Sequence, residues 1–140
     1  MSPLLGRRIR QVHFFWVCRD RSSFEWFTQL LKELEEHNLG DYLSINIFLT
    51  GKAPDAATMM QPLDSDVEFS DSVTGLKAQT TFGRPDWDEI FGGLSRRHRG
   101  ARTGVFFCGP KVLSNILKTK CKEFSDAKSK TRFVYKKENF

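Results

Sequence analysis

The feature that most constrains the fold is the alternation of short apolar runs with amphipathic stretches of helical period. The apolar runs, which we expect to be strands, cover residues 12–17, 43–49, 103–107 and 131–135. The amphipathic stretches, which we expect to be helices, cover about residues 22–40, 86–100 and 110–124. Such alternation predicts a layered α/β domain with a parallel sheet, in which ligands bind at the carboxyl ends of the strands.

The sequence also predicts how deeply the strands are buried and where the helices begin and end. The run at 12–17 is almost continuously apolar, which predicts a strand covered on both faces, and we expect 103–107 to be the next buried strand. Ser22 stands three residues before Glu25, and Asp86 three before Glu89, the spacing of a helix capping box. We expect the first helix to stop at Gly40 and the last to have Pro110 in its first turn. Residues 50–72 lack periodicity, which predicts a long mobile loop.

Composition bounds the class of protein. A chain of 140 residues with 39% hydrophobic residues suits one compact domain, here 12–140 after an N-terminal tail at 1–11. No run of about 20 apolar residues predicts a membrane span, and the tail has no signal-peptide pattern. The cysteines, at 18, 108 and 121, are too widely spaced for a zinc site or a disulfide framework. We therefore predict no metal site and a reduced, cytosolic compartment.

The net charge of +5 raises the question of nucleic-acid binding. Basic residues concentrate at 7–10, 96–102 and 118–137, whereas most aromatic residues belong to the apolar runs. A nucleic-acid site combines cations with stacking aromatics on one surface. The pattern therefore favours a solvated basic face, attracted to an anionic nucleotide or a membrane surface, and we predict no nucleic-acid partner.

Candidate ligand-binding residues follow two of the expected strands. Cys18-Arg19-Asp20 comes after the first strand, and Cys108-Gly109-Pro110 follows the run at 103–107. Because carboxyl ends of parallel strands meet at one edge, we expect both segments on the same rim. Gly109 permits close approach of the backbone, and the helix that begins at Pro110 directs amide groups and its positive end at an anion. The pattern suits a nucleotide.

Six segments point to a family when they are taken in order. They are Phe15–Asp20, Phe24–Phe27, Thr74–Leu76, Gly83–Trp87, Gly104–Pro110 and the terminal Glu138–Phe140. On these segments the chain resembles, over residues 12–140, the C-terminal NADPH-binding portion of the NADPH oxidases, which are flavoproteins related to the ferric and ferredoxin reductases. The resemblance implies a three-layer NADP-binding domain of the ferredoxin reductase type.

The resemblance also implies roles for individual residues. Arg19 would face the 2′-phosphate of NADPH and select against NADH, with Arg84 as a second arginine of that pocket. Cys108 would lie near the nicotinamide ring, and Phe140 would stack on the flavin and move aside for hydride transfer; these two are the candidate catalytic residues. The full set of candidate cofactor-binding residues is Trp16, Cys18, Arg19, Arg84, Cys108, Gly109, Pro110, Glu138, Asn139 and Phe140.

The same resemblance implies a larger context. FAD would be bound mainly by a domain absent from this chain, and haem only by membrane helices of the parent oxidase. The partners would be NADPH, those flavin-binding and haem-bearing transmembrane parts and cytosolic regulatory subunits. The chain would then lie at the cytoplasmic face of a membrane and serve superoxide production.

We expect one part of the family domain to have no counterpart before Val12. The family's first strand and its glycine-rich loop would lie between the strands at 12–17 and 103–107, so we expect a split sheet with exposed edges. An isolated chain of this kind is expected to be inactive. Two alternatives stay open: a ferric-chelate reductase-type oxidoreductase, and a non-catalytic fragment that binds or competes with a full-length oxidase.

Overall fold

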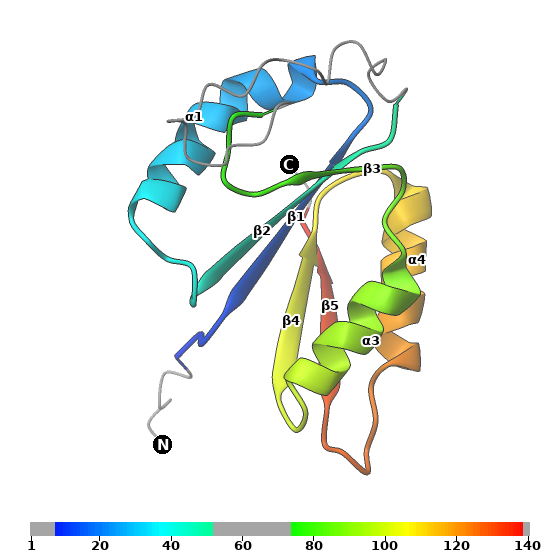
Figure 1. The fold of residues 1–140 in the computed structure, drawn as a ribbon. Coiled ribbons are helices and arrows are strands. Elements are labelled where there is room, and N and C mark those ends of the chain that lie inside the picture. Colours follow the sequence, from blue (N-terminus) through cyan, green and yellow to red (C-terminus); the bar gives the residue numbers. More distant parts are fainter. Residues whose placement is uncertain (1–7, 52–73, 139–140) are drawn as a thin grey trace. The chain divides into compact units, whose positions relative to one another are not determined.

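The computed structural model describes residues 8–51 and 74–138 and divides the chain into two compact units, Met1–Arg84 and Pro85–Phe140. Each unit combines parallel strands with helices (Figure 1). The predicted α/β class with parallel strands is confirmed. Most of the loop predicted at 50–72 lies outside the described residues. No helix in the described ranges is long and apolar enough to span a membrane.

The first unit is a three-stranded parallel sheet in the order β1-β2-β3. β1 (Val12–Cys18) and β2 (Leu43–Leu49) confirm two predicted strands, and α1 (Ser22–Glu36) connects them. β3 (Thr80–Phe82) is an addition to the predicted order. Its three residues are too few to show a periodic pattern, and only pairing with β2 reveals it.

The core of the first unit lies between α1 and one face of this sheet. Phe24 and Leu31 of α1, each 3% exposed, pack with the buried Ile47. The ring of Trp16 stacks on Phe27 of the same helix, with centroids 5.0 Å apart and planes inclined by 18°. All seven β1 residues are only partly buried, so the prediction of a strand buried on both faces is wrong. The apolar run predicts deep burial, but α1 covers only one face of the sheet that contains β1.

The predicted limits of α1 are corrected at both ends. Arg21, not Ser22, is the N-cap, and no side chain caps the helix. Backbone carbonyls take that role, because the amide of Ser23 donates to the oxygen of Asp20 at 3.1 Å. The helix ends at Glu36 rather than at Gly40, since Asn38 adopts a positive φ of 52° and reverses the chain earlier.

The end of α1 fixes the segment that leads into β3. The carboxylate of Glu35 accepts hydrogen bonds from the amides of Lys77 at 2.8 Å and Ala78 at 2.9 Å. Leu76, only 1% exposed, enters the core, and Gly75 takes a φ of 68° beside it. The Thr74–Leu76 segment is therefore a turn that docks β3 against the helix.

The second unit pairs two parallel strands with two helices. Its elements in chain order are α3 (Trp87–Arg97), β4 (Arg102–Phe107), α4 (Lys111–Glu123) and β5 (Arg132–Lys137). The predicted cap of α3 is confirmed, because the side chain of Asp86 accepts a hydrogen bond from the amide of Glu89 at 3.0 Å. Pro110 is the N-cap of α4 rather than part of its first turn.

The core of the second unit also lies on one sheet face. Phe91, Leu117, Cys121 and Phe133 are each at most 5% exposed. β4 alternates between exposed and partly buried residues, and Phe106 is 67% exposed, so the prediction of a buried strand at 103–107 is wrong. Helices cover only the alternate positions. Burial raises the pKa of the Cys121 thiol to about 11, which keeps this core cysteine neutral.

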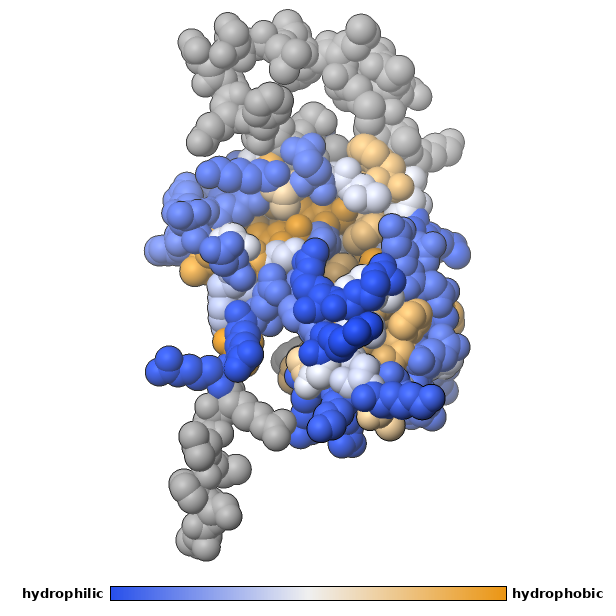
Figure 2. Space-filling model, turned by 60° about the horizontal axis from the view of Figure 1, so that its bottom comes forward, coloured by the Kyte–Doolittle hydropathy of each residue, from blue (hydrophilic) through white to orange (hydrophobic). Residues whose placement is uncertain are grey.

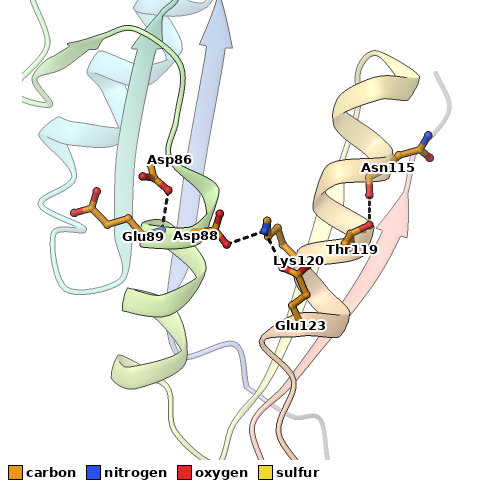
Figure 3. A network of polar contacts seen from close by, with 7 residues as sticks. All are labelled: Asp86, Asp88, Glu89, Asn115, Thr119, Lys120 and Glu123. Atoms are coloured by element: carbon orange, nitrogen blue, oxygen red, sulfur yellow. Dashed lines mark hydrogen bonds and ion pairs between the residues drawn. The ribbon is translucent and has the colours of Figure 1, made fainter.

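A lysine joins the two helices of the second unit (Figure 3). The ammonium nitrogen of Lys120 on α4 lies 2.7 Å from carboxylate oxygens of both Asp88 on α3 and Glu123. The hydrogen bond to Asp88, followed by that to Glu123, raises the pKa of Lys120. This ion pair links α3 to α4, whose first turn follows the Cys108–Pro110 segment.

In the described part of the chain the strands pair in two sheets, β1-β2-β3 and β4-β5, and the split of a single sheet stays a prediction. In the second sheet, the amides of Arg132 and Glu138 donate to the carbonyls of Ala101 and Phe107. Parallel pairing alternates, so the backbone groups of the intervening β4 residues, among them Gly104, point to the other side. No strand of the described residues pairs with that side of β4.

Candidate functional site

Three strand ends meet at the carboxyl edge of the first sheet. The amide of Thr50, directly after β2, donates to the carbonyl of Cys18 at 2.8 Å, and the amide of Gly83, directly after β3, donates to that of Leu49 at 2.8 Å. These bonds align the segments that follow β1, β2 and β3. Arg19 and Arg84 are both exposed at this edge. The structure therefore brings the two predicted phosphate-binding arginines to one edge of one unit.

Close backbone packing shapes this edge at Gly51. A Cβ atom at position 51 would collide with the carbonyl oxygen of Arg19. The absence of a side chain lets the segment after β2 lie directly against the segment after β1. Gly51 thus sets the backbone from which the Arg19 side chain projects.

We expect Gly51→Ala to destabilise the protein by about 1–3 kcal/mol, because the collision is with backbone and one strand end has to move. Gly40→Ala is the matched control, since nothing lies within 4 Å of a Cβ there. Urea denaturation followed by circular dichroism measures both. A Gly51→Ala variant as stable as the control would show that the edge is loosely packed.

Cys18 and Trp16 belong to the interior side of the same edge. The Cys18 thiol lies 3.4 Å from the carbonyl oxygen of Asp20. Burial raises its pKa, and the hydrogen bond from Trp16 opposes that shift more weakly. A neutral, hydrogen-bonded thiol is suited to shaping the edge rather than to nucleophilic attack. Trp16 is partly buried and packs against Phe14, Phe24 and Phe27, and its contact with a cofactor stays a prediction.

The second unit presents the Cys108-Gly109-Pro110 segment between β4 and α4, and all three residues are exposed. A Cβ on Gly109 would lie 2.7 Å from Cζ of Phe107, so a side chain there would displace that ring. Pro110 is extended, with φ −62° and ψ 145°, and no side chain caps α4. The first amides of α4 are therefore available to an anionic ligand.

The chain end returns to this segment. β5 stops at Lys137, and the amide of Glu138 donates to the carbonyl oxygen of Phe107 at 3.0 Å. Glu138 is thereby fixed beside the residue that precedes Cys108. Asn139 and Phe140 lie outside the described residues, so their contacts with nicotinamide or flavin stay predictions.

The predicted residues thus form two groups, one in each unit. Trp16, Cys18, Arg19 and Arg84 belong to the first, and Cys108, Gly109, Pro110 and Glu138 to the second. The rim shared by both groups stays a prediction. Sequence reasoning missed Thr50 and Gly51, whose bonds and close packing organise the first edge. A glycine two residues beyond a predicted strand was the available signal.

A hollow of about 330 Å³ lies elsewhere, on the surface of α4. It is lined by Asn115, Ile116, Thr119 and Lys120, none of which was predicted as a site residue. Lys120 is already held by two carboxylates, and the other polar contact of this surface is the bond from the Thr119 hydroxyl to the carbonyl of Asn115 (Figure 3). Residues from a single helix do not enclose a ligand. Nor do the described ranges group three His, Cys, Asp or Glu side chains for a metal ion.

Comparison with known proteins links this geometry to a family. Residues 6–122 match the family described as the ferric reductase NAD binding domain. A superoxide-generating NADPH oxidase heavy chain of Dictyostelium discoideum is 46% identical over 139 residues, which are 99% of this chain and 26% of that protein. NADPH oxidase 3 of Homo sapiens is 41% identical over 138 residues, which are 95% of this chain and 24% of that protein.

The similarity extends to NADPH oxidase 1 of Mus musculus, 37% identical over 138 residues. In each case the chain spans about a quarter of the length of the relative that it matches. The matched portion includes both groups of candidate residues, except that the family match ends at residue 122, before Glu138.

Proposed function

Because the chain belongs to the family of ferric reductase NAD-binding domains, we propose that it is the NADPH-binding part of a superoxide-generating NADPH oxidase. In this role it holds NADPH so that hydride passes to FAD, with onward electron transfer through haem to oxygen in parts of the oxidase outside this chain. The observation that carries the proposal is the pair of exposed arginines at the edge shaped by Gly51.

The first unit supplies what a phosphorylated ribose requires. Neighbouring strands lie about 4.8 Å apart, so β1 and β3, on either side of β2, end about 10 Å from each other. Arg19 and Arg84 follow those two strands and can approach one phosphate from two sides. A guanidinium pairs with phosphate through two parallel hydrogen bonds, which favours NADPH over NADH.

The second unit supplies the groups for the opposite end of the nucleotide. Gly109 leaves the backbone open, and the free amides of α4 face anionic groups of the ligand. Cys108 is exposed next to them, and Glu138 is fixed beside Phe107. NADPH and the flavin supply the hydride chemistry, so this chain needs no nucleophile of its own. Its residues bind and orient the nucleotide, and Phe140 restrains idle transfer by stacking on the flavin.

A chimaera tests the proposal. We expect this chain, exchanged for the matching quarter of the Dictyostelium discoideum relative, to support NADPH-dependent superoxide formation, measured by superoxide dismutase-sensitive cytochrome c reduction. The isolated chain with added FAD should reduce little dye, because it spans only about a quarter of the length of its relatives. A folded chimaera without NADPH-dependent activity would contradict the proposal, and robust turnover by the isolated chain would contradict its dependence on other parts.

The family match also keeps a ferric-chelate reductase-type function as a second candidate. The nucleotide chemistry would be the same, and the electron acceptor would differ. The chimaera distinguishes the two when ferric chelate and oxygen are offered separately. Preferential reduction of the chelate would favour the reductase.

The expected split of the sheet favours a third candidate, a non-catalytic fragment that binds or competes with a full-length oxidase. The side of β4 away from β5 has no strand partner in the described residues, and an open edge invites pairing with another chain. Co-expression of the chain with a full-length relative tests this role. Co-purification with loss of superoxide formation would support it, and unchanged activity without co-purification would reject it.

A further inference from the structure

Only the second unit of the protein carries a net positive charge. Residues 85–140 contain 13 Lys or Arg and 6 Asp or Glu, a net charge of +7, whereas residues 1–84 contain 9 and 11, a net charge of −2. The net charge of +5 is therefore the excess of one unit over the other. An asymmetry of this kind indicates attraction to an anionic partner.

Much of this excess gathers where two connections meet, between α3 and β4 and between α4 and β5. The amide of Gly100 donates to the hydroxyl of Thr131 at 3.0 Å, and the amide of Arg132 donates to the carbonyl of Ala101 at 3.0 Å. These bonds join the connections at the amino end of both strands, opposite Cys108. We call the exposed cations of this end the basic face: Arg97, Arg99, Arg102, Lys128, Lys130 and Arg132.

The basic face has little internal neutralisation. Residues 97–102 and 126–132 contain one acidic side chain, Asp126. Its carboxylate accepts hydrogen bonds from the amides of Lys128 and Ser129, each at 3.0 Å, and these bonds hold its pKa low. Lys120, which forms ion pairs with Asp88 and Glu123, is outside the basic face.

Two arginines of this face are placed against one another. Arg102 and Arg132 are register partners on neighbouring strands, and both are exposed. Val105 and Tyr135, three residues further along each strand, pack against the core, so the two arginines share the opposite sheet face. Like charges side by side on a sheet are unfavourable for stability. A polyanion that contacts the face would relieve this repulsion.

We propose that the basic face binds the phosphate-bearing headgroups of an anionic membrane surface. In Figure 1 both connections lie at the lower end of β4 and β5, and Figure 2, which brings that end forward, shows strongly hydrophilic residues gathered there. Cations spread over two exposed connections can contact many headgroups at once, and their attractions add. The inference does not depend on the nucleotide site, which occupies the other end of β4.

A membrane surface fits the composition of this face better than nucleic acid does. Residues 97–102 and 126–132 contain no Phe, Trp or Tyr on which bases could stack. They also contain no large apolar residue that would insert between acyl chains. The binding is therefore electrostatic and should weaken as salt is raised beyond about 0.1 M, where the screening length falls below about 10 Å.

Vesicle co-sedimentation of the full chain tests the proposal. The probes are vesicles of phosphatidylcholine mixed with phosphatidylserine, and vesicles of phosphatidylcholine alone. The test variant combines Arg99→Gln, Lys128→Gln and Lys130→Gln. The control combines Lys118→Gln, Lys122→Gln and Lys136→Gln, which removes the same charge from exposed positions outside the basic face. Thermal unfolding followed by circular dichroism verifies that both variants are folded.

We expect the chain to bind the mixed vesicles and not phosphatidylcholine alone. The test variant should partition roughly 10- to 100-fold more weakly, with the control close to the parent. Equal losses in both variants, or binding that ignores phosphatidylserine, would overturn the proposal. So would displacement from the vesicles by inorganic phosphate, single-stranded DNA or polyglutamate at matched anion concentration, which would assign the face to free phosphate, nucleic acid or an acidic protein.

Discussion

Replacement of Phe91 by Ala is expected to destabilise the second unit by about 3–5 kcal/mol. Phe91 is 3% exposed, and its ring centroid lies 5.2 Å from that of Phe133 on β5 and 6.0 Å from that of Phe124, which follows α4. It therefore joins α3 to both other layers of the core. A unit of this size is stable by only roughly 3–8 kcal/mol, so the variant should be largely unfolded there.

Chemical denaturation followed by circular dichroism measures this loss. Val112→Ala is the matched control, because Val112 is on α4 but 73% exposed, and its truncation should change stability by less than about 0.5 kcal/mol. If Phe91→Ala lost no more stability than Val112→Ala, the aromatic cluster would not be what holds the unit together. Unfolding would also remove the proposed nucleotide contacts of the α4 amides and Cys108.

The order of the major elements could be predicted because each one carries a local signal. β1, β2, β4 and β5 are apolar runs, and the cap of α3 depends on two residues three apart, Asp86 and Glu89. What could not be predicted depends on distant contacts. β3 exists by pairing with β2, and α1 begins on backbone carbonyls rather than at Ser22. The exposure of Phe106 follows from helices that cover one face only.

The candidate site shows the same division. Arg19 and Cys108 could be chosen because they follow predicted strands, and Arg84 because the segment Gly83–Trp87 resembles that of a family. The structure adds that Arg19 and Arg84 share one sheet edge, which no spacing in the chain reveals, since 64 residues separate them. The role of Gly51 could not be predicted for the same reason, because the group that excludes a side chain there is the carbonyl of Arg19, which is distant in sequence.

Selectivity for NADPH is expected to depend on Arg19. Arg19→Ala should weaken the binding of NADPH by about 1.5–3 kcal/mol, because a charged hydrogen bond to the 2′-phosphate is lost. The affinity for NADH, which lacks that phosphate, should change little. The loss for NADPH corresponds to roughly 10- to 150-fold in affinity. The measurements are nucleotide titration of the chain and the KM values of the chimaera for both nucleotides.

Two further variants separate a phosphate contact from a general effect of charge. Arg10→Ala removes an exposed arginine at the opposite end of β1 and should leave both nucleotides unaffected. The double variant Arg19→Ala/Arg84→Ala should lose less NADPH-binding free energy than the sum of the two single losses. Both guanidinium groups are proposed to hold one phosphate, and residues that share a partner are coupled by about 0.5–3 kcal/mol. Equal losses of NADPH and NADH affinity in Arg19→Ala would refute the phosphate assignment, whereas additive losses would place Arg84 on a different group of the ligand.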